Sequence, residues 1–170
     1  LLKKRKKIES ILEIGTGSGC ISTTISLENL ATSIIATDIS KKALSIAEEN
    51  LQKFKIQNID FKIHDFLQTD INSTFDVVVS NPPYIGSDEM NDLQKEVQDY
   101  DPKIALTDNN DGLSFYRRFA EIGASLLNEN GFMLLEFGGA HQVEAITTIF
   151  EAQKFNVKFH NDLQGDPRVV

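Results

Sequence analysis

The sequence is poor in the residues that mark secreted, membrane and metal-binding proteins. It has one cysteine, Cys20, which excludes an internal disulfide and fits a reducing compartment. No apolar run approaches the roughly 20 residues that a membrane helix needs, and the charged N-terminus is not followed by the apolar stretch of a signal peptide. No cysteines and histidines have zinc-ligand spacing. We therefore expect a cytoplasmic protein without a membrane contact or a metal.

The length and the hydrophobic content indicate one domain of ordinary size. The chain has 170 residues, of which 41% are hydrophobic, enough for a sizeable core. It begins with Leu1 rather than methionine and ends on residues 168–170, which have the pattern of a strand just beginning. We expect residues 1–170 to form a single domain cut from a longer protein.

The charge is unevenly placed. The net charge is −8, and residues 86–111 carry most of it, with an excess of acidic side chains. A basic run, Lys3 to Lys7, stands at the other end of the chain. The acidic segment is either a solvated surface or a face for a partner that is not a polyanion, and the sequence does not choose between the two. Direct nucleic-acid binding is not expected on either reading.

Apolar runs and helical stripes alternate along the chain. This alternation predicts an α/β fold, a mostly parallel sheet with helices on both faces. Ser40 is expected to cap the helix that follows the second strand. The polar stretch 85–111 is too long for a plain connection, so we expect it to be functional or mobile. The predicted strands are residues 10–15, 33–39, 59–65, 75–80, 131–138 and 156–162, with 59–65 nearer an edge.

A glycine-rich loop follows the first predicted strand. It reads Gly15-Thr16-Gly17-Ser18-Gly19, and Cys20 stands where a dinucleotide-binding fingerprint needs glycine. Such a loop lets a ligand approach main-chain amides and the start of a helix. By itself the loop is a weak signal, and the alternative is a plain tight turn from strand to helix.

Acidic residues end the next two predicted strands. Asp38 can accept the hydroxyls of a ribose, while Asp65 can accept from an adenine amino group and Phe66 can cover the ring. Each acid alone could instead cap the structure that follows it. Ligands of open α/β sheets sit at these strand ends, so the three features together favour an adenosine-containing ligand.

The fourth predicted strand ends in Asn81-Pro82-Pro83-Tyr84. The prolines stiffen this segment and leave its carbonyl oxygens without local donors. The side-chain oxygen of Asn81 and the carbonyl of Pro82 can accept both N–H bonds of a planar NH₂ group, and Tyr84 can pack on its face. The plain alternative is a loop that only ends a strand. A held NH₂ group beside an adenosine site suggests methyl transfer from S-adenosylmethionine.

Several segments together resemble the HemK/PrmC family of release factor glutamine methyltransferases. They are "LEIGTGSGCI", "TDIS..AL", "HDF", "SNPPYI", "EVQDYDPKIAL…DGLSFYRRF", "LLEFG..HQ" and "DLQGDPRVV", from about residue 9 to residue 170. The resemblance implies methylation of N5 of the glutamine in the Gly-Gly-Gln motif of class-1 peptide chain release factors. It also implies a Rossmann-like, seven-stranded class I methyltransferase sheet, whose last, antiparallel strand would be truncated here.

The resemblance assigns roles to the candidate residues. It implies that Gly15 to Gly19 hold the methionine part of S-adenosylmethionine, Asp38 the ribose, and Asp65 with Phe66 the adenine. Asn81 to Tyr84 would hold the glutamine amide, with Asn81 also near the cofactor. Asp101-Pro102 departs from the family's Glu-Pro, and the family's N-terminal helical docking domain is absent from this chain.

Other functions use some of the same features. A DNA or RNA amino-methyltransferase, acting on adenine N6 or guanine N2, shares the Asn-Pro-Pro-Tyr element but should have a basic face. A non-catalytic scaffold has no use for the amide-holding groups of Asn81 and Tyr84. Cys20 counts against a nicotinamide oxidoreductase.

Overall fold

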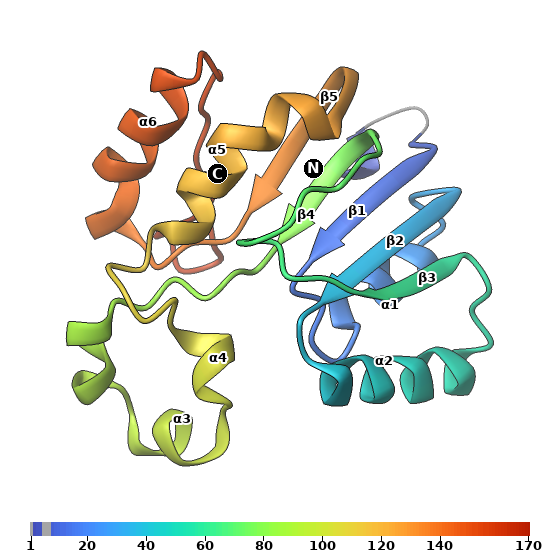
Figure 1. Cartoon of the computed structure of the whole chain (residues 1–170), viewed down its shortest axis with the longest axis horizontal. Coiled ribbons are helices and arrows are strands. Elements are labelled where there is room, and N and C mark those ends of the chain that lie inside the picture. The colour runs from blue at the N-terminus through green and yellow to red at the C-terminus, as the bar shows by residue number, and fades with distance from the viewer. Residues whose placement is uncertain (1, 5–7) are drawn as a thin grey trace. The chain divides into compact units, whose positions relative to one another are not determined.

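The computed structural model describes residues 2–4 and 8–170 (Figure 1). Arg5, Lys6 and Lys7 of the basic run therefore lie outside the described residues. The chain divides into two compact units, Leu1–Asn81 with Ser125–Leu134, and Pro82–Ala124 with Leu135–Val170. The single domain over residues 1–170 stays a prediction.

The first unit is built on a five-stranded sheet in the order β3-β2-β1-β4-β5. β1 pairs in parallel with both β2 and β4, and β2 pairs in parallel with β3. Continuous apolar runs form the central strands because both faces are covered, and Ile11, Leu12, Val77 and Val78 are fully buried. β3 is an edge strand, as predicted. The strands are β1 (Ser10–Ile14), β2 (Ser33–Asp38), β3 (Ile59–Ile63), β4 (Phe75–Ser80) and β5 (Leu127–Leu135).

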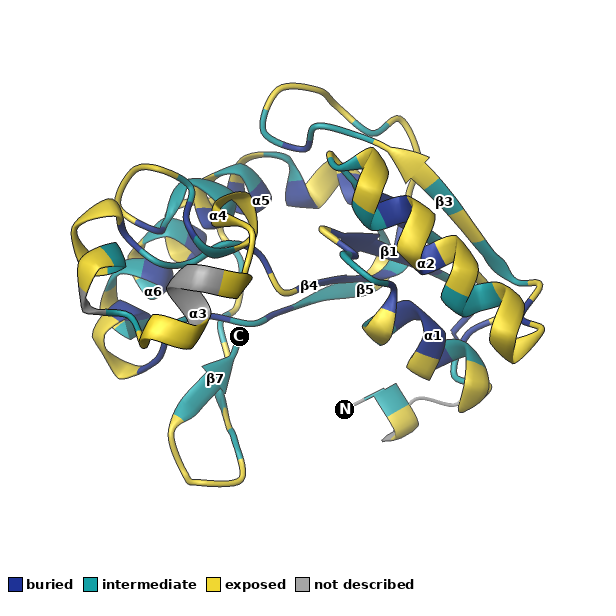
Figure 2. Ribbon diagram, turned by 90° about the horizontal axis from the view of Figure 1, so that it is seen from below, coloured by how far each residue is buried: buried dark blue, intermediate teal, exposed yellow. Residues whose placement is uncertain are grey.

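Two helices of this unit, α1 (Cys20–Leu27) and α2 (Lys41–Phe54), pack against β2 and β3 and against each other (Figure 1). The predicted cap of α2 is confirmed, because the Ser40 hydroxyl accepts a hydrogen bond from the Ala43 N–H at 3.2 Å. Leu44 and Ala47 are the buried residues of α2, and Figure 2 shows that this helix has a buried and an exposed side. A short 3₁₀ turn, η1 (Leu2–Lys4), precedes the sheet.

The second unit is mainly helical. No helix in the described part of the chain is long and apolar enough to cross a membrane. The acidic stretch 86–111 is built from short helical pieces rather than from one long loop. The last two residues of α5 count with the first unit. The elements are η2 (Ser87–Asp92), α3 (Lys95–Tyr100), α4 (Lys103–Leu106), α5 (Ser114–Leu126), η3 (Ala140–Gln142), α6 (Val143–Ala152), β6 (His160–Asn161) and β7 (Pro167–Val169).

The predicted seven-stranded sheet was wrong in its strand count. The main sheet has five strands, and β6 and β7 form a separate antiparallel pair. Only two residues of the predicted strand 156–162 pair, and Phe159 instead packs edge-on against Phe137 with ring centroids 5.4 Å apart. The prediction that residues 168–170 begin an antiparallel strand is confirmed, because Val170 and Leu135 exchange backbone hydrogen bonds of 2.8 and 2.9 Å.

Asp76 ties together three strands of the sheet. Its Oδ2 accepts hydrogen bonds from the N–H groups of Glu9 and Ser10, at 2.8 and 3.1 Å, and its Oδ1 accepts from the Asn128 side chain at 2.9 Å. The bonds from Asn128 and from Glu9 favour the charged form and lower the pKa of Asp76 below 3.8.

We predict that Asp76→Asn lowers the free energy of unfolding by about 1–3 kcal/mol at pH 7, because charge-assisted hydrogen bonds are lost. A carboxyl group whose pKa is lowered on folding stabilises the protein above its usual pKa, and this contribution disappears as the pH falls below that value. The difference between variant and wild type should therefore shrink below about pH 4. Urea denaturation from pH 7 to pH 3 measures it, and an equal difference at both ends would contradict the assignment.

Candidate functional site

Four strand ends meet at one edge of the sheet. Ile14, the last residue of β1, lies beside Thr37 in β2 and Ser80 in β4, and Asp38 lies beside Ile63 in β3. The glycine loop, Asp38, Asp65 and Asn81 each end or directly follow one of these strands. The structure thus gathers the predicted residues of the first unit at one edge, and their roles stay predictions.

The glycine loop depends on backbone conformations that other residues rarely adopt. Gly15, Gly17 and Gly19 have φ angles of 69°, 58° and 80°. A Cβ atom on Gly15 or Gly17 would meet no atom within 4 Å, so one side of the loop is not filled by protein. A Cβ on Gly19 would lie 3.1 Å from the Cβ of Ala47, so this glycine also allows α1 and α2 to approach closely.

Asp38 holds the loop from the end of β2. Its Oδ2 accepts a hydrogen bond from the Gly17 N–H and its Oδ1 accepts from the Ser40 N–H, both at 2.8 Å. The carboxylate thus links the loop to the start of α2, while Ser40 is the residue that caps the helix. A carboxylate offers about four acceptor positions, so these two bonds leave room for further donors.

Glu13 is a site residue that the sequence analysis missed. Its side chain is 1% exposed, and its Oε2 accepts hydrogen bonds from the Thr16 hydroxyl at 2.8 Å and the Ser22 N–H at 3.1 Å. Burial raises the pKa of Glu13 to about 7, although hydrogen bonds from Thr16 and Ser22 oppose the shift. The available signal was an acidic residue inside an apolar run directly before the glycine loop.

Asp65 and Phe66 follow β3, as predicted. Asp65 Oδ1 accepts a hydrogen bond from the Leu67 N–H at 3.1 Å, and its carbonyl accepts from the Thr69 N–H at 2.9 Å, so it starts a turn. Phe66 is only 4% exposed, and its ring packs inside the protein rather than presenting an open face. Adenine binding by these two residues stays a prediction.

The Asn-Pro-Pro-Tyr element leaves the sheet at the end of β4. Asn81 is exposed, Pro82 is buried, and Pro83 and Tyr84 are half-buried. Asn81 counts with the first unit, while residues 82–84 count with the second.

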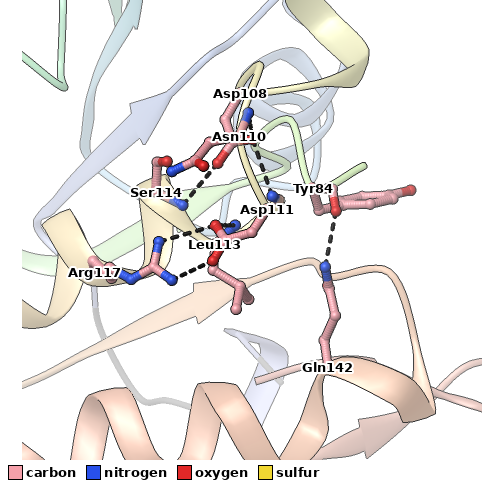
Figure 3. A network of polar contacts seen from close by, with 9 residues as sticks. Tyr84, Asp108, Asn110, Asp111, Leu113, Ser114, Arg117 and Gln142 are labelled. Carbon is pink, nitrogen blue, oxygen red and sulfur yellow. Dashed lines mark hydrogen bonds and ion pairs between the residues drawn. The ribbon is translucent and has the colours of Figure 1, made fainter. Parts of the chain in front are cut away.

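The backbone after the prolines is held by other parts of the second unit. The Tyr84 carbonyl accepts a hydrogen bond from Gln142 Nε2 at 2.8 Å (Figure 3). Gly112, with a φ of 76°, lies so close that a Cβ atom there would be 2.3 Å from this oxygen. The Ile85 N–H donates to the Leu106 carbonyl at 3.0 Å. Tyr84 is therefore fixed at its main chain.

Part of the acidic stretch 86–111 has a structural role. Asp108 accepts hydrogen bonds from three backbone N–H groups, those of Asn110, Gly112 and Ser114 (Figure 3). Asp111 forms an ion pair with Arg117. Asp88, Glu89, Glu96 and Asp101 are exposed and remain available to solvent or to a partner.

A family model for the methyltransferase small domain matches residues 1–98. The chain belongs to this family. A methyltransferase from Pyrococcus furiosus has the same fold, with a TM-score of 0.71 over 99% of this chain and 76% of that one, at 20% identity. The predicted α/β, Rossmann-like class I methyltransferase fold is thereby confirmed.

Two relatives have names that are more specific than that of the family model. The release factor glutamine methyltransferase of Bacillus subtilis is 37% identical over 181 residues, covering all of this chain and 62% of that protein. The bifunctional methyltransferase of Rickettsia felis is 40% identical over 162 residues, covering 94% of this chain and 31% of that protein. The predicted resemblance to release factor glutamine methyltransferases is confirmed. The chain spans less than two thirds of the length of either relative.

We predict that Glu13→Gln changes how stability depends on pH. A carboxyl group whose pKa is raised on folding stabilises the protein fully below its unfolded value of 4.5 and loses that contribution as the pH rises through about 7. The wild type should therefore lose roughly 2–3 kcal/mol more than the variant over this range. Denaturation at several pH values measures the difference, and parallel curves for the two proteins would contradict a raised pKa.

Proposed function

We propose that the protein is a cytoplasmic S-adenosylmethionine-dependent methyltransferase that methylates N5 of the glutamine in the Gly-Gly-Gln motif of class-1 peptide chain release factors. One observation carries the proposal. The Asn-Pro-Pro-Tyr element begins at the sheet edge that also holds the glycine loop and Asp38. The proposal is supported by the likeness of the whole chain to the Bacillus subtilis protein.

The residues at this edge fit the proposed cofactor. The unfilled side of the glycine loop leaves space for the methionine part beside Gly15, Thr16, Gly17, Ser18 and Gly19. Asp38 has acceptor positions left for ribose hydroxyls. Asp65 would bind the adenine amino group, and Phe66 would need to expose its ring to contact the base.

The Asn81–Tyr84 element would make the amide nitrogen a better nucleophile by position and electrostatics. The Asn81 side-chain oxygen and the Pro82 carbonyl accept the two N–H bonds, which stabilises positive charge on the nitrogen during transfer. Pro83 keeps the segment stiff, and Tyr84 packs on the amide plane. When bound, S-adenosylmethionine would supply the methyl group: its carbon–sulfur electron pair would stay on sulfur as the new nitrogen–carbon bond formed, and a proton of the nitrogen would leave to water.

The charge of the second unit favours a protein substrate over a nucleic acid. Exposed acidic residues lie in the segment after Tyr84, among them Asp88, Glu89, Glu96 and Asp101. They would repel phosphates and attract a basic protein surface. This supports a release factor over the DNA or RNA alternative, which shares the Asn-Pro-Pro-Tyr element.

The decisive assay uses S-adenosylmethionine labelled in its methyl group. The protein is offered a class-1 release factor, the same factor with its Gly-Gly-Gln glutamine replaced, duplex DNA, and RNA. Label on the intact factor alone is expected. Label on nucleic acid, or equal label on the glutamine variant, would contradict the proposed substrate.

We predict that Asn81→Ala lowers kcat by about 100-fold, because one of two acceptors for the amide is lost. Cofactor affinity, measured by calorimetry, should change little. Asp38→Ala should have the opposite pattern, because it removes a proposed ribose ligand: it should weaken cofactor binding by about 1–3 kcal/mol. Normal turnover of the Asn81 variant would remove this residue from the mechanism, and unchanged affinity of the Asp38 variant would move the ribose site elsewhere.

A further inference from the structure

The side chain of Gln142 connects two segments of the second unit. Gln142 is the last residue of η3 and is 4% exposed. Its Nε2 donates a hydrogen bond to the Tyr84 carbonyl at 2.8 Å (Figure 3), and its Oε1 accepts one from the Gly138 N–H at 2.9 Å. One buried amide group therefore joins the segment that follows β5 to the tyrosine of the Asn-Pro-Pro-Tyr element.

The two bonds use both ends of this amide group. A Cβ atom on Gly138 would lie 3.0 Å from Oε1, so the side chain is packed closely against the backbone there. A carboxylate of the same size would keep the acceptor for Gly138 but would have no proton for the Tyr84 carbonyl. An apolar side chain of similar size would lose both bonds. The position therefore needs a group that donates at one end and accepts at the other.

A second segment holds the main chain that follows Tyr84. The Ile85 N–H donates to the Leu106 carbonyl at 3.0 Å, and the Ser87 N–H donates to the Asn110 carbonyl at 2.8 Å. These backbone bonds fix the chain after the Asn-Pro-Pro-Tyr element. The bond from Gln142 acts one step earlier, at the last residue of the element itself.

The prolines transmit this anchor to the groups that would hold the substrate. Proline has a fixed φ angle, and a residue before proline is restricted to extended backbone. The Pro82 carbonyl is therefore joined to the anchored Tyr84 carbonyl by a segment with little freedom to turn. Pro82 is also buried, which restricts it further. The orientation of the Tyr84 carbonyl thus helps to set the direction of the Pro82 carbonyl.

We propose that Gln142 is a positioning residue, which holds the Tyr84 carbonyl so that the Pro82 carbonyl and the Tyr84 ring meet the substrate amide in one orientation. A misplaced reactant group is costly for rate, so the contact acts on the methyl-transfer step rather than on cofactor binding. The inference rests on the proposed function, because this orientation matters only if the element holds a planar amide.

The first test observes the contact and needs no activity. Tyr84-Ile85 is the only Tyr-Ile pair in the sequence, so protein with ¹³C-carbonyl tyrosine and ¹⁵N-isoleucine gives one NMR cross-peak for this peptide bond. Gln142→Glu at about pH 8.5 should move the carbonyl resonance of Tyr84 to lower frequency, because an ionised carboxylate cannot donate to this oxygen.

The matched control is Gln153→Glu, which makes the same charge change at an exposed position directly after α6. It should leave the cross-peak in place. An unmoved peak in Gln142→Glu, or an equal movement in Gln153→Glu, would overturn the anchoring of Tyr84.

The second test separates positioning from general stability. With a release factor as substrate, Gln142→Glu should lower kcat and kcat/KM equally, about tenfold at about pH 8.5, while cofactor affinity stays unchanged. Burial raises the pKa of a carboxyl group, so the loss should shrink as the pH falls to about 6, where a protonated carboxyl can again donate to the Tyr84 carbonyl.

Gln142→Leu has no such proton and should show the same loss at both pH values. This variant is interpreted only if circular dichroism shows a folded protein, and the Gln142→Glu variant decides the test by itself. A wild-type kcat in Gln142→Glu at both pH values would overturn the proposal. So would a loss that is matched by an equal loss of cofactor affinity.

The two tests distinguish failure of this inference from failure of the proposed function. If the unmutated protein methylates no release factor but the cross-peak moves as expected, the proposed function is wrong, and only the anchoring of Tyr84 is supported. If the unmutated protein methylates the factor and Gln142→Glu does so at the same rate, the function stands and the inference is wrong.

Discussion

The candidate site depends on the parallel pairing of β1 with both β2 and β4. This register places Ile14 beside Thr37 and Ser80, so the chain segments after β1, β2 and β4 emerge at one edge. Two buried hydroxyls reinforce it: Thr37 donates to the Glu13 carbonyl at 3.1 Å and Ser80 to the Ile14 carbonyl at 2.7 Å. A slip of one residue would turn every side chain to the other face and separate the glycine loop from Asp38.

Two carboxylates then give the glycine loop its shape in different ways. Asp38 is half-buried and binds the Gly17 N–H, whereas Glu13 is buried and binds Thr16 and Ser22. The charge of Asp38 also contributes to the raised pKa of Glu13, so the two groups are coupled through the loop they hold. The loop is thus ordered by protein contacts before a ligand arrives, which reduces the cost of binding.

Local patterns predicted the elements, and long-range contacts account for what was missed. The Ser40 cap, the edge position of β3 and the placement of Asp38 and Asn81 follow from short-range pattern and from the rule that parallel strands end together. The bond from Gln142 to Tyr84 joins residues 58 positions apart, and no spacing signals it. The alternating run 156–162 predicted a strand. A strand also needs a neighbour to pair with, and only His160 and Asn161 have one. Phe159 packs edge-on against the ring of Phe137 instead.

The central claim is that the edge formed by the ends of β1, β2, β3 and β4 binds the cofactor. A crystal structure of the protein with S-adenosylhomocysteine tests it most directly, because one map locates every part of the ligand. The account predicts the ribose at Asp38 and the amino-acid part along residues 15–19, with Asn81 beside the sulfur. A ligand bound away from the carboxyl ends of β1 and β2 would contradict it.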